Sequence, residues 1–492
     1  MLRSSSNANK KTESLFLVVT LLLVLNITTN TPSDFDMWWH LRSGNEMWNL
    51  GKILLQDSFS YTRNGAPWVN AFWISDIGMY GIWKLGGFFA LTIVVSLIAV
   101  GVMSIIYFQL EGSIYLRALL LLIATFAAGV NWSPRPQILS FILLAGLDYY
   151  LYYHHNIRRR PLWVMAPLFA LWGNLHGGFI WGILVLIATI SGDLADNLMT
   201  NQPVLKLQEV GNLTFWTLAG GLAVLINPNG LAIWKLPFYQ VKVSLIAITE
   251  WLSPDFHNFF THPALWLLFL LIIGIAFSKR QLSFADLFKG LGFTYMLFVA
   301  QRNMAPYAII ITPIIGRQLG SAVETFKGAT LFQKIKTLSF LYQRPSNQVS
   351  EKVTFLMNTI LVSILAAFFL ISAYIASAPS QIEAKVPAKA VRWIAANHPN
   401  GPIFNSYNWG GYLTWELRDY PVYMDGRADL YGDQIINEWL DIANGRNKGI
   451  SALNDRGIKL IFLEPNWPLI DKLPQNGWKE LYSDEKISIY GR

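Results

Sequence analysis

The chain has 492 residues, of which 53% are hydrophobic and only 14% are charged. Soluble domains carry about 25% charged residues, so this composition excludes an ordinary soluble protein and predicts one with many membrane spans. The net charge is +8, but the basic residues cluster in short loops between apolar runs, which argues against nucleic-acid binding. The absence of cysteine excludes disulfides, thiol chemistry and cysteine-ligated metals.

The first apolar run covers residues 14–29 and follows the basic residues Arg3, Lys10 and Lys11. No small-residue cleavage site is evident between this run and Asp34, so we expect an uncleaved first span with the N-terminus inside. The polar segment that follows would then lie outside the membrane.

That polar segment, residues 34–73, mixes acidic and basic side chains with an unusual density of tryptophan. The mixture suits neither a membrane span nor a solvated loop. It predicts a segment at the membrane surface, with tryptophan rings in the headgroup layer and polar groups over an opening in the protein. We interpret Asp57 and Arg63 as surface charges. Asp34 and Asp36 would face the opening, although either could instead cap the following helix.

Further apolar stretches lie near residues 86–109, 115–130, 137–153, 161–174, 178–195, 211–226, 263–278, 287–300, 304–316 and 353–375. Together with the first run they predict about eleven spans, although several are shorter than the roughly 20 residues that a bilayer requires. The basic groups at 158–160, 279–280 and 317–352 then all lie inside, as the positive-inside rule requires.

The sequence predicts two domains: a transmembrane domain over residues 1–376, with 31–73 as its first outer loop, and a small α/β domain outside the membrane over 377–492. In the second domain, helical patterns cover 387–397 and 433–443, and strand-like runs cover 402–404, 421–424, 459–463 and 487–490. We interpret its Asp-Gly-Arg piece at 425–427 as a tight turn with an internal ion pair, or as part of an acceptor site.

Polar groups that resist burial in lipid gather at the outer ends of the predicted spans. They include Asp34, Asp36, His40, Arg135, Asn174, His176, Glu250, Arg302 and Asn303. Taken singly, the arginines could reach to lipid headgroups and His176 could be an ordinary interfacial histidine. Their concentration on one face predicts an active site that opens outside. No phosphate loop or dinucleotide-binding fingerprint competes, and the His154-His155 pair lacks metal-ligating partners.

The layout resembles the GT-C glycosyltransferase superfamily, which includes protein O-mannosyltransferases, aminoarabinose transferases and oligosaccharyltransferases. The shared features are a first outer loop that opens on an acidic motif, surface helices in that loop, many spans and an outer C-terminal domain. As in the aminoarabinose transferase type, Asp36 is followed at the same spacing by Gly51, then by Ala-Pro-Trp and Phe-Trp pieces. Met37 stands where those families carry a second acid, so the acidic partner of Asp36 would be Asp34.

A second resemblance covers nearly the full length and points to a family of bacterial membrane proteins whose reaction is not defined. The matching pieces are DFDMWWHLRSG, RPQ, NLHGG, NPNG, EWLSP, QRN, NSYNWGGYLTWEL and VYMDGRADLY. This set indicates a family more firmly than it indicates a reaction.

The resemblance implies a polytopic α-helical enzyme in the bacterial cytoplasmic membrane, without a cofactor. It would move a sugar, with inversion, from a polyprenyl-phosphate carrier to a glycan, lipid or protein acceptor on the outer face. We expect Asp36 to act as the base with Asp34 as its partner. The other expected roles are donor-phosphate binding by Arg135, Arg302 and His176, and substrate binding by His40, Asn174, Glu250 and Asn303. Asp34, Asp36 and Glu250 could instead hold a divalent cation.

Three alternatives remain open. The protein could polymerise or ligate a whole lipid-linked glycan, it could transport a lipid-linked substrate, or it could be a non-catalytic sensor or assembly subunit. Transporters tend to show paired repeats and polar residues at mid-membrane depth, and neither is clear in this sequence. Loss of function on neutralising Asp36, without loss of folding, would favour an enzyme.

Overall fold

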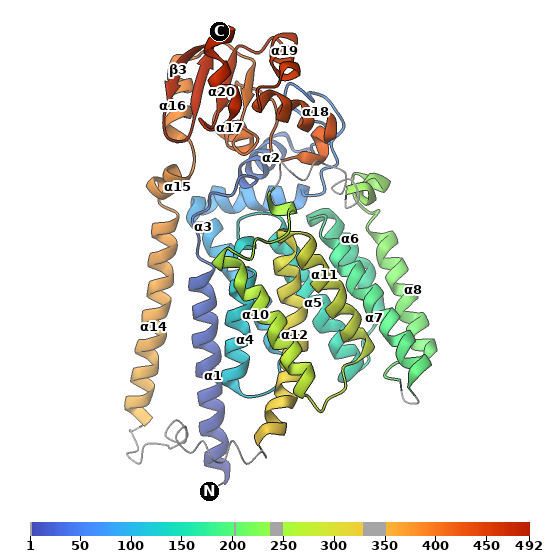
Figure 1. Cartoon of the computed structure of the whole chain (residues 1–492). Helices are drawn as coiled ribbons and strands as arrows, with labels where there is room; N and C mark the ends of the chain where they lie inside the picture. The colour runs from blue at the N-terminus through green and yellow to red at the C-terminus, as the bar shows by residue number, and fades with distance from the viewer. Residues whose placement is uncertain (1, 201–202, 237–248, 328–350) are drawn as a thin grey trace.

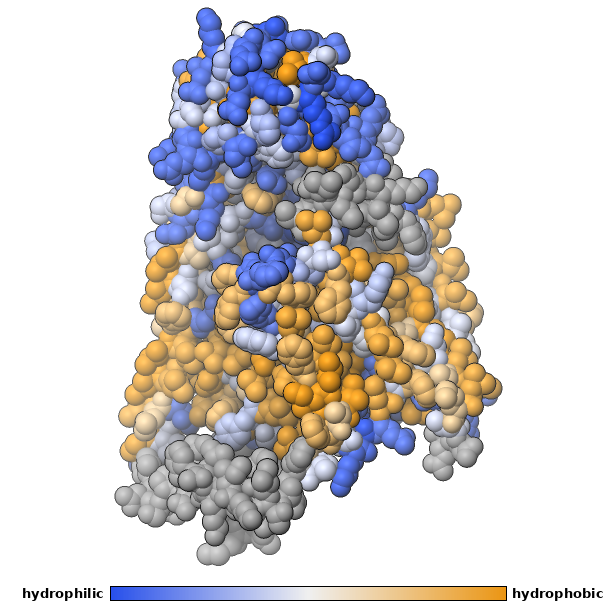
Figure 2. All heavy atoms as spheres, viewed as in Figure 1, coloured by the Kyte–Doolittle hydropathy of each residue, from blue (hydrophilic) through white to orange (hydrophobic). Residues whose placement is uncertain are grey.

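The computed structural model of the chain describes residues 2–200, 203–236, 249–327 and 351–492. Long helices form a bundle, and a small α/β domain rests on one end of it (Figure 1). We call this end of the bundle the domain end and the opposite one, where the N-terminus lies, the far end. The side of the bundle seen in Figure 2 is broadly hydrophobic, whereas the α/β domain is mostly hydrophilic.

The apolar stretches of the sequence fold as the helices of the bundle. These are α1 (Leu2–Ile27), α3 (Trp73–Tyr107), α4 (Ile114–Ala127), α5 (Gln137–Asn156), α6 (Met165–Leu175), α7 (Phe179–Met199), α8 (Leu207–Ala223), α10 (His262–Phe277), α11 (Phe284–Val299), α12 (Met304–Lys327) and α14 (Glu351–Ala376). Within the described residues, 4 helical segments are long and apolar enough to cross a membrane: Trp73–Tyr107, Phe179–Met199, Phe259–Phe277 and Lys352–Ala376. The count of about eleven spans therefore stays a prediction, and most of the basic stretch 317–352 lies outside the described residues.

The bundle has one continuous apolar core, in which the side chains of Phe141, Phe169 and Trp172 are fully buried. Small residues allow close helix approach within it. A Cβ atom at Gly192 on α7 would lie only 2.2 Å from the backbone nitrogen of Ala285 on α11, so these two helices can touch only through a glycine.

The first loop carries a helix, α2 (Met37–Leu50), that lies between the bundle and the α/β domain. Gly51 ends this helix in the left-handed conformation (φ 63°), and its N–H donates to the carbonyl of Met47 at 3.0 Å. Helix α3 then begins at the domain end and kinks at Gly86 and Gly87, where Gly87 has φ 59°. The predicted span at 86–109 therefore begins at this kink.

The α/β domain contains a four-stranded sheet with the order β1-β2-β4-β3. The strands are β1 (Ile403–Asn405), β2 (Leu460–Leu463), β3 (Lys479–Ser483) and β4 (Ser488–Gly491), and only the β1–β2 pair is parallel. The helices are α15 (Pro379–Lys385), α16 (Ala388–Asn397), α17 (Gly410–Glu416), α18 (Ala428–Ala443), α19 (Asn447–Asp455) and α20 (Pro468–Lys472). Both predicted helices and three of the predicted strands are confirmed, and β3 was missed.

The predicted strand at 421–424 is wrong, because its backbone pairs with the first loop instead of with the sheet. Val422 N–H donates to the carbonyl of Phe59 at 3.0 Å, and its own carbonyl accepts from Tyr61 N–H at 3.1 Å. The first loop and the α/β domain also share apolar clusters, in which Trp39 and Trp68 pack with Tyr423. The boundary at 376–377 thus separates two lengths of sequence that fold against each other.

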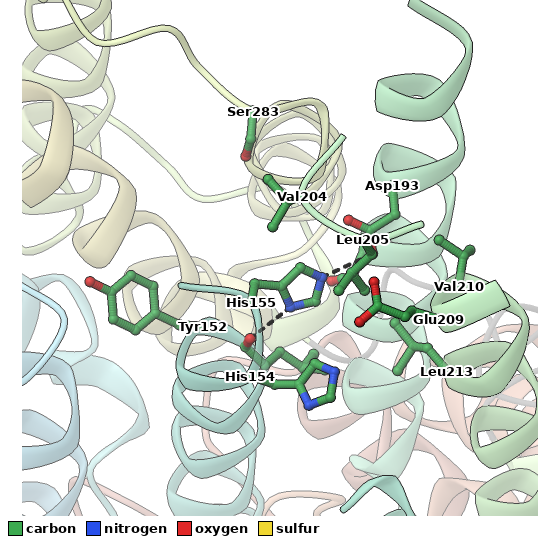
Figure 3. A network of polar contacts seen from close by, with 12 residues as sticks. Tyr152, His154, His155, Asp193, Val204, Leu205, Glu209, Val210, Leu213 and Ser283 are labelled. Carbon is green, nitrogen blue, oxygen red and sulfur yellow. Dashed lines mark hydrogen bonds and ion pairs between the residues drawn. The ribbon is translucent and has the colours of Figure 1, made fainter. Parts of the chain in front are cut away.

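The far end carries a polar network that joins α5 to α7 (Figure 3). His155 donates through Nδ1 to the carbonyl of Leu151 at 2.7 Å, and its Nε2 lies 2.9 Å from Asp193 Oδ2. The ring of His154 instead accepts, through Nδ1, the N–H of Arg160 at 2.9 Å. The two neighbouring histidines therefore have separate structural partners.

Candidate functional site

A cavity of about 710 Å³ lies at the domain end, between the helix ends and the α/β domain. It brings together eight of the nine side chains that the sequence singled out: Asp34, Asp36, His40, Arg135, His176, Glu250, Arg302 and Asn303. They come from five separate stretches of the chain. These positions fit the predicted site on one face of the protein. Antiparallel helices end at the same side of a bundle, so loops that are far apart in sequence lie close together there.

Asn174 is the exception and does not line the cavity. Its Oδ1 accepts from Trp73 Nε1 at 2.8 Å, and its amide donates to the carbonyls of Ala170 at 2.8 Å and Ile226 at 2.6 Å. These internal bonds use the side chain to tie α6 to α3 and to the segment after α8. The expectation that Asn174 binds substrate therefore does not fit its position.

The guanidinium of Arg135 is the centre of the acidic group. It lies in a turn between two prolines, just before α5. Its Nε is 3.2 Å from Asp34 Oδ1, its Nη1 is 2.8 Å from Glu250 Oε2, and its Nη2 contacts Asp36 Oδ2. We call these four residues the cavity cluster. Arg135, which was expected to bind the donor phosphate, is thus already the counter-ion of three carboxylates.

The carboxylates of the cavity cluster differ in acidity. Burial raises the pKa of Asp34, although Arg135 opposes this effect. Burial also acts to raise the pKa of Glu250, but Arg135 and Arg302 outweigh it and lower that pKa to about 2. Glu250 therefore stays ionised across the physiological range, while Asp34 accepts a proton more readily than an exposed aspartate.

A divalent cation does not fit the cavity cluster as it stands. Carboxylate oxygens are suitable ligands for such an ion, but the guanidinium already lies among them. Across the described ranges, no three histidine or acidic side chains are arranged to hold a metal ion. The alternative of a metal held by these acids would require displacement of Arg135.

Asp36 lies at the start of α2 but its side chain does not cap the helix. Its Oδ1 accepts from Trp39 Nε1 at 3.1 Å, and its Oδ2 contacts Arg135. The α/β domain closes over it: a Cβ atom at Gly426 would lie 1.8 Å from Asp36 Oδ1, so only glycine fits there. Both oxygens of the expected base are therefore engaged, and the domain forms part of its surroundings.

Two histidines line the cavity with different hydrogen-bond partners. His40 Nδ1 lies 2.6 Å from Oδ1 of Asp76, a fully buried residue of α3. His176 Nδ1 lies 2.8 Å from Ser140 Oγ and accepts the N–H of Gly178, also at 2.8 Å. Burial, together with Arg302 and other nearby cations, lowers the pKa of His176 well below its usual value. His176 is thus neutral, with its proton on Nε2.

The α/β domain supplies one wall of the cavity, including Tyr407, Asn408, Arg427 and Asp429. Arg427 is buried between the rings of Phe59 and Trp68, each 4.8 Å from the guanidinium carbon. It donates to both oxygens of Asp425, at 2.9 and 2.7 Å, which confirms the predicted internal ion pair.

The same guanidinium also pairs with the first loop, where its Nη2 lies 2.8 Å from Asp57 Oδ1. Asp57 is buried, and the interpretation of it as a surface charge was wrong. Elsewhere on this wall, burial raises the pKa of Asp429 to about 6.

Another part of the cavity wall is apolar. It is formed by Val130, Tyr295, Met296 and Val299, of which the last three belong to α11. Tyr295 is 71% exposed and Val299 is 48% exposed, so this wall continues onto the hydrophobic surface of the bundle.

Comparison with known proteins gives structural matches only. No protein-family model matches the chain, and no curated protein matches it. The archaeal oligosaccharyltransferase AglB from Archaeoglobus fulgidus, in complex with an inhibitory peptide and a dolichol-phosphate, aligns at TM-score 0.59 and 11% identity over 93% of this chain and 70% of its own. ArnT from Cupriavidus metallidurans, in the apo state, aligns at TM-score 0.52 and 14% identity over 98% of both chains. The chain has the GT-C fold.

A third GT-C structure, the arabinofuranosyltransferase AftD from Mycobacteria, aligns at TM-score 0.50 and 13% identity over 96% of this chain but only 39% of its own. The fold that the resemblance implied is therefore confirmed. Asp76, the hydrogen-bond partner of His40, was missed from the sequence, whereas the Asp-Gly-Arg piece of the α/β domain had been considered as part of an acceptor site. A lone acid in an otherwise apolar helix was the available signal for Asp76.

Proposed function

We propose that the protein is a glycosyltransferase that moves a sugar from a polyprenyl-phosphate carrier to a glycan, lipid or protein acceptor. The observation that carries this proposal is one cavity in a GT-C fold whose walls are acidic, cationic and apolar. Similar structures are named as transferases of sugars or oligosaccharides, and one holds a dolichol-phosphate. In this proposal the domain end faces the outside of the bacterial cytoplasmic membrane, and the N-terminus lies inside.

The apolar wall supports a lipid-linked donor. Tyr295, Met296 and Val299 extend from the cavity onto the hydrophobic side of the bundle. A polyprenyl chain can lie along this wall while its phosphate and sugar enter the cavity from the side. A water-soluble nucleotide sugar would gain little from such a wall.

The phosphate would bind between Arg302 and His176. When the bond from the anomeric carbon to the phosphate oxygen breaks, negative charge builds on the phosphate, and donors already in place stabilise it. The Arg302 guanidinium lies over the ring of Trp251, 5.4 Å from its centre, which holds it at the cavity wall. His176 adds the neutral Nε2–H described above. Arg135 acts indirectly, because it fixes the carboxylates.

The sugar would lie against the cavity cluster. Asp34, Asp36 and Glu250 place negative charge where an oxocarbenium-like centre gains positive charge, and Asn303 adds an amide. By analogy with the superfamily, the acceptor attacks from the opposite side and inverts the anomeric centre. Two groups on this wall can take the proton of the acceptor hydroxyl, namely Asp36 and His40.

The test is an assay of purified protein in nanodiscs with a panel of radiolabelled polyprenyl-phosphate sugars. The proposal expects one donor to release free polyprenyl phosphate and to label an acceptor from an envelope-glycan extract. Growth of a glycan chain on the carrier would instead favour a polymerase or ligase. Exchange of intact donor between the two leaflets, without release, would favour a transporter. Binding without either outcome would favour a sensor.

A further inference from the structure

His40, which lines the cavity, pairs with the buried Asp76, and this pair bears on which of the two candidate groups takes the proton. His40 belongs to α2 and Asp76 to the first part of α3, and their side chains are 4% and 0% exposed. Their atoms Nδ1 and Oδ1 are 2.6 Å apart. A carboxylate buried inside a protein requires a partner, and this one has a histidine that itself lines the cavity.

This contact fixes the tautomer of His40. A carboxylate oxygen accepts hydrogen bonds, so Nδ1 carries the proton and Nε2 of the neutral ring has a lone pair. The ring is held by aromatic neighbours: its centre is 3.5 Å from that of Trp39 and 5.1 Å from that of Phe72. Within the described residues, Nε2 makes no hydrogen bond.

His176 has the opposite arrangement. Because its Nδ1 accepts a backbone N–H, its Nε2 carries the proton and can only donate. The two histidines flank the same ring, since Phe72 lies 5.6 Å from His176 and 5.1 Å from His40. One cavity thus offers a proton donor and a proton acceptor of the same chemical type, both beside the ring of Phe72.

Asp36, the base expected from the sequence, already has donors at both of its oxygens. Arg135 contacts Asp34, Asp36 and Glu250, and both oxygens of Asp36 have donors. A carboxylate that a guanidinium and an indole N–H stabilise in its ionised form is a weak base. His40 has a buried anion behind it instead, which stabilises the imidazolium that forms when the ring takes a proton.

We propose that His40, oriented by Asp76, is the general base of the sugar transfer. The acceptor oxygen forms its bond to the anomeric carbon, its proton moves to His40 Nε2, and the carbon–oxygen bond to the phosphate breaks with its electron pair left on the phosphate. Asp76 is a positioning residue. This inference rests on the proposed function, and it assigns Asp36 to the sugar's developing positive charge rather than to the proton.

The test compares His40→Gln and Asp76→Asn with wild type, using the active donor, in single-turnover transfer from about pH 5 to pH 8. Because only the unprotonated ring accepts a proton, the wild-type rate rises with pH. Asp76, Asp34 and His176 each interact electrostatically with His40. We expect His40→Gln to lower the rate about 10²- to 10⁴-fold and to remove this rise, while donor binding stays unchanged.

Asp76→Asn should also lower the rate, and histidine NMR with isotope-labelled protein should show that the Nδ1–H tautomer of His40 is lost. The matched control is His257→Gln, whose histidine is fully exposed in the loop before α10 and should leave the rate unchanged. A normal rate and pH profile in folded His40→Gln would overturn the assignment of the base alone. Failure of the wild type to turn over any donor would overturn the proposed function, and the assignment with it.

Discussion

The structure contains two clusters of buried charged residues: the cavity cluster at the domain end, and a second one inside the helix bundle. The first borders the cavity and the second does not. The bundle cluster consists of Asp148, Asp286, Lys289 and Arg317, on α5, α11 and α12. Lys289 Nζ lies 2.8 Å from Asp148 Oδ1 and 3.4 Å from Asp286 Oδ1, and Arg317 Nη2 lies 2.9 Å from both Asp286 oxygens. None of its four side chains lines the cavity described above.

The charge balance of the two clusters also differs. The bundle cluster pairs two acids with two bases, whereas the cavity cluster places three acids on one guanidinium, with Arg302 close to Glu250. Paired charge inside a protein is therefore a poor sign of function by itself. The cavity cluster differs in two ways. Its acidic groups outnumber its basic ones, and it borders a cavity large enough for a substrate. The comparison predicts that changes in the cavity cluster affect catalysis, whereas changes in the bundle cluster affect stability alone.

The largest effect is expected for Arg135→Ala, because it removes the shared counter-ion of three carboxylates. We expect a loss of about 3 kcal/mol of stability, together with loss of transfer. Arg135→Lys keeps the charge but not the planar set of donors, and should recover only part of both. Thermal unfolding in detergent and donor turnover measure the two effects. Unchanged stability in Arg135→Ala would contradict the idea that this guanidinium holds the carboxylates in place.

A change in the bundle cluster should separate stability from activity. Asp286→Asn leaves Arg317 without its carboxylate partner inside the helix bundle. We expect a loss of about 3 kcal/mol or more in unfolding free energy. The turnover of each folded molecule should stay within about twofold of wild type, since the α11 residues that line the cavity, Tyr295, Met296 and Val299, are unaltered. Turnover per folded molecule is measured after gel filtration, which removes aggregated protein.

The smallest effect has the opposite sign and concerns the α/β wall of the cavity. Burial raises the pKa of Asp429 from 3.8 to about 6, so the folded protein binds a proton more tightly than the unfolded chain does. Its ionised form therefore lowers stability, progressively from about pH 4 to pH 6, and the cost is fully present above pH 6. Asp429→Asn should then unfold at a higher temperature than wild type at pH 7 and at a similar temperature at pH 4. A lower unfolding temperature at pH 7 would contradict the assigned pKa shift.

The sequence predicted most of the bundle helices and eight polar side chains that line the cavity, for a simple physical reason. Apolar stretches of suitable length become helices, and polar residues at the ends of antiparallel helices come together at the same end of the bundle. Arg135, Arg302 and Glu250 were found in this way, although their mutual pairing was not. Asn174 shared the signal but bonds internally, because polarity alone does not show which way a side chain points.

The contacts that sequence missed join segments far apart in the chain. Asp57 pairs with Arg427 across 370 positions, and neither looks buried from its neighbours in sequence. Arg317 was grouped with the basic loop that follows it, but it lies inside α12 and pairs with Asp286. Such pairs depend on how folded units dock, and local patterns carry no information about that.

The most direct test of the central claim uses the same chemical change in each cluster, Asp36→Asn and Asp286→Asn. Release of polyprenyl phosphate from the active donor is measured for each folded protein. The account predicts that Asp36→Asn loses about 10²-fold or more of the rate and keeps its stability within about 1 kcal/mol, whereas Asp286→Asn keeps the rate and loses stability. A normal rate in Asp36→Asn, or a selective loss of rate in a stable Asp286→Asn, would contradict it.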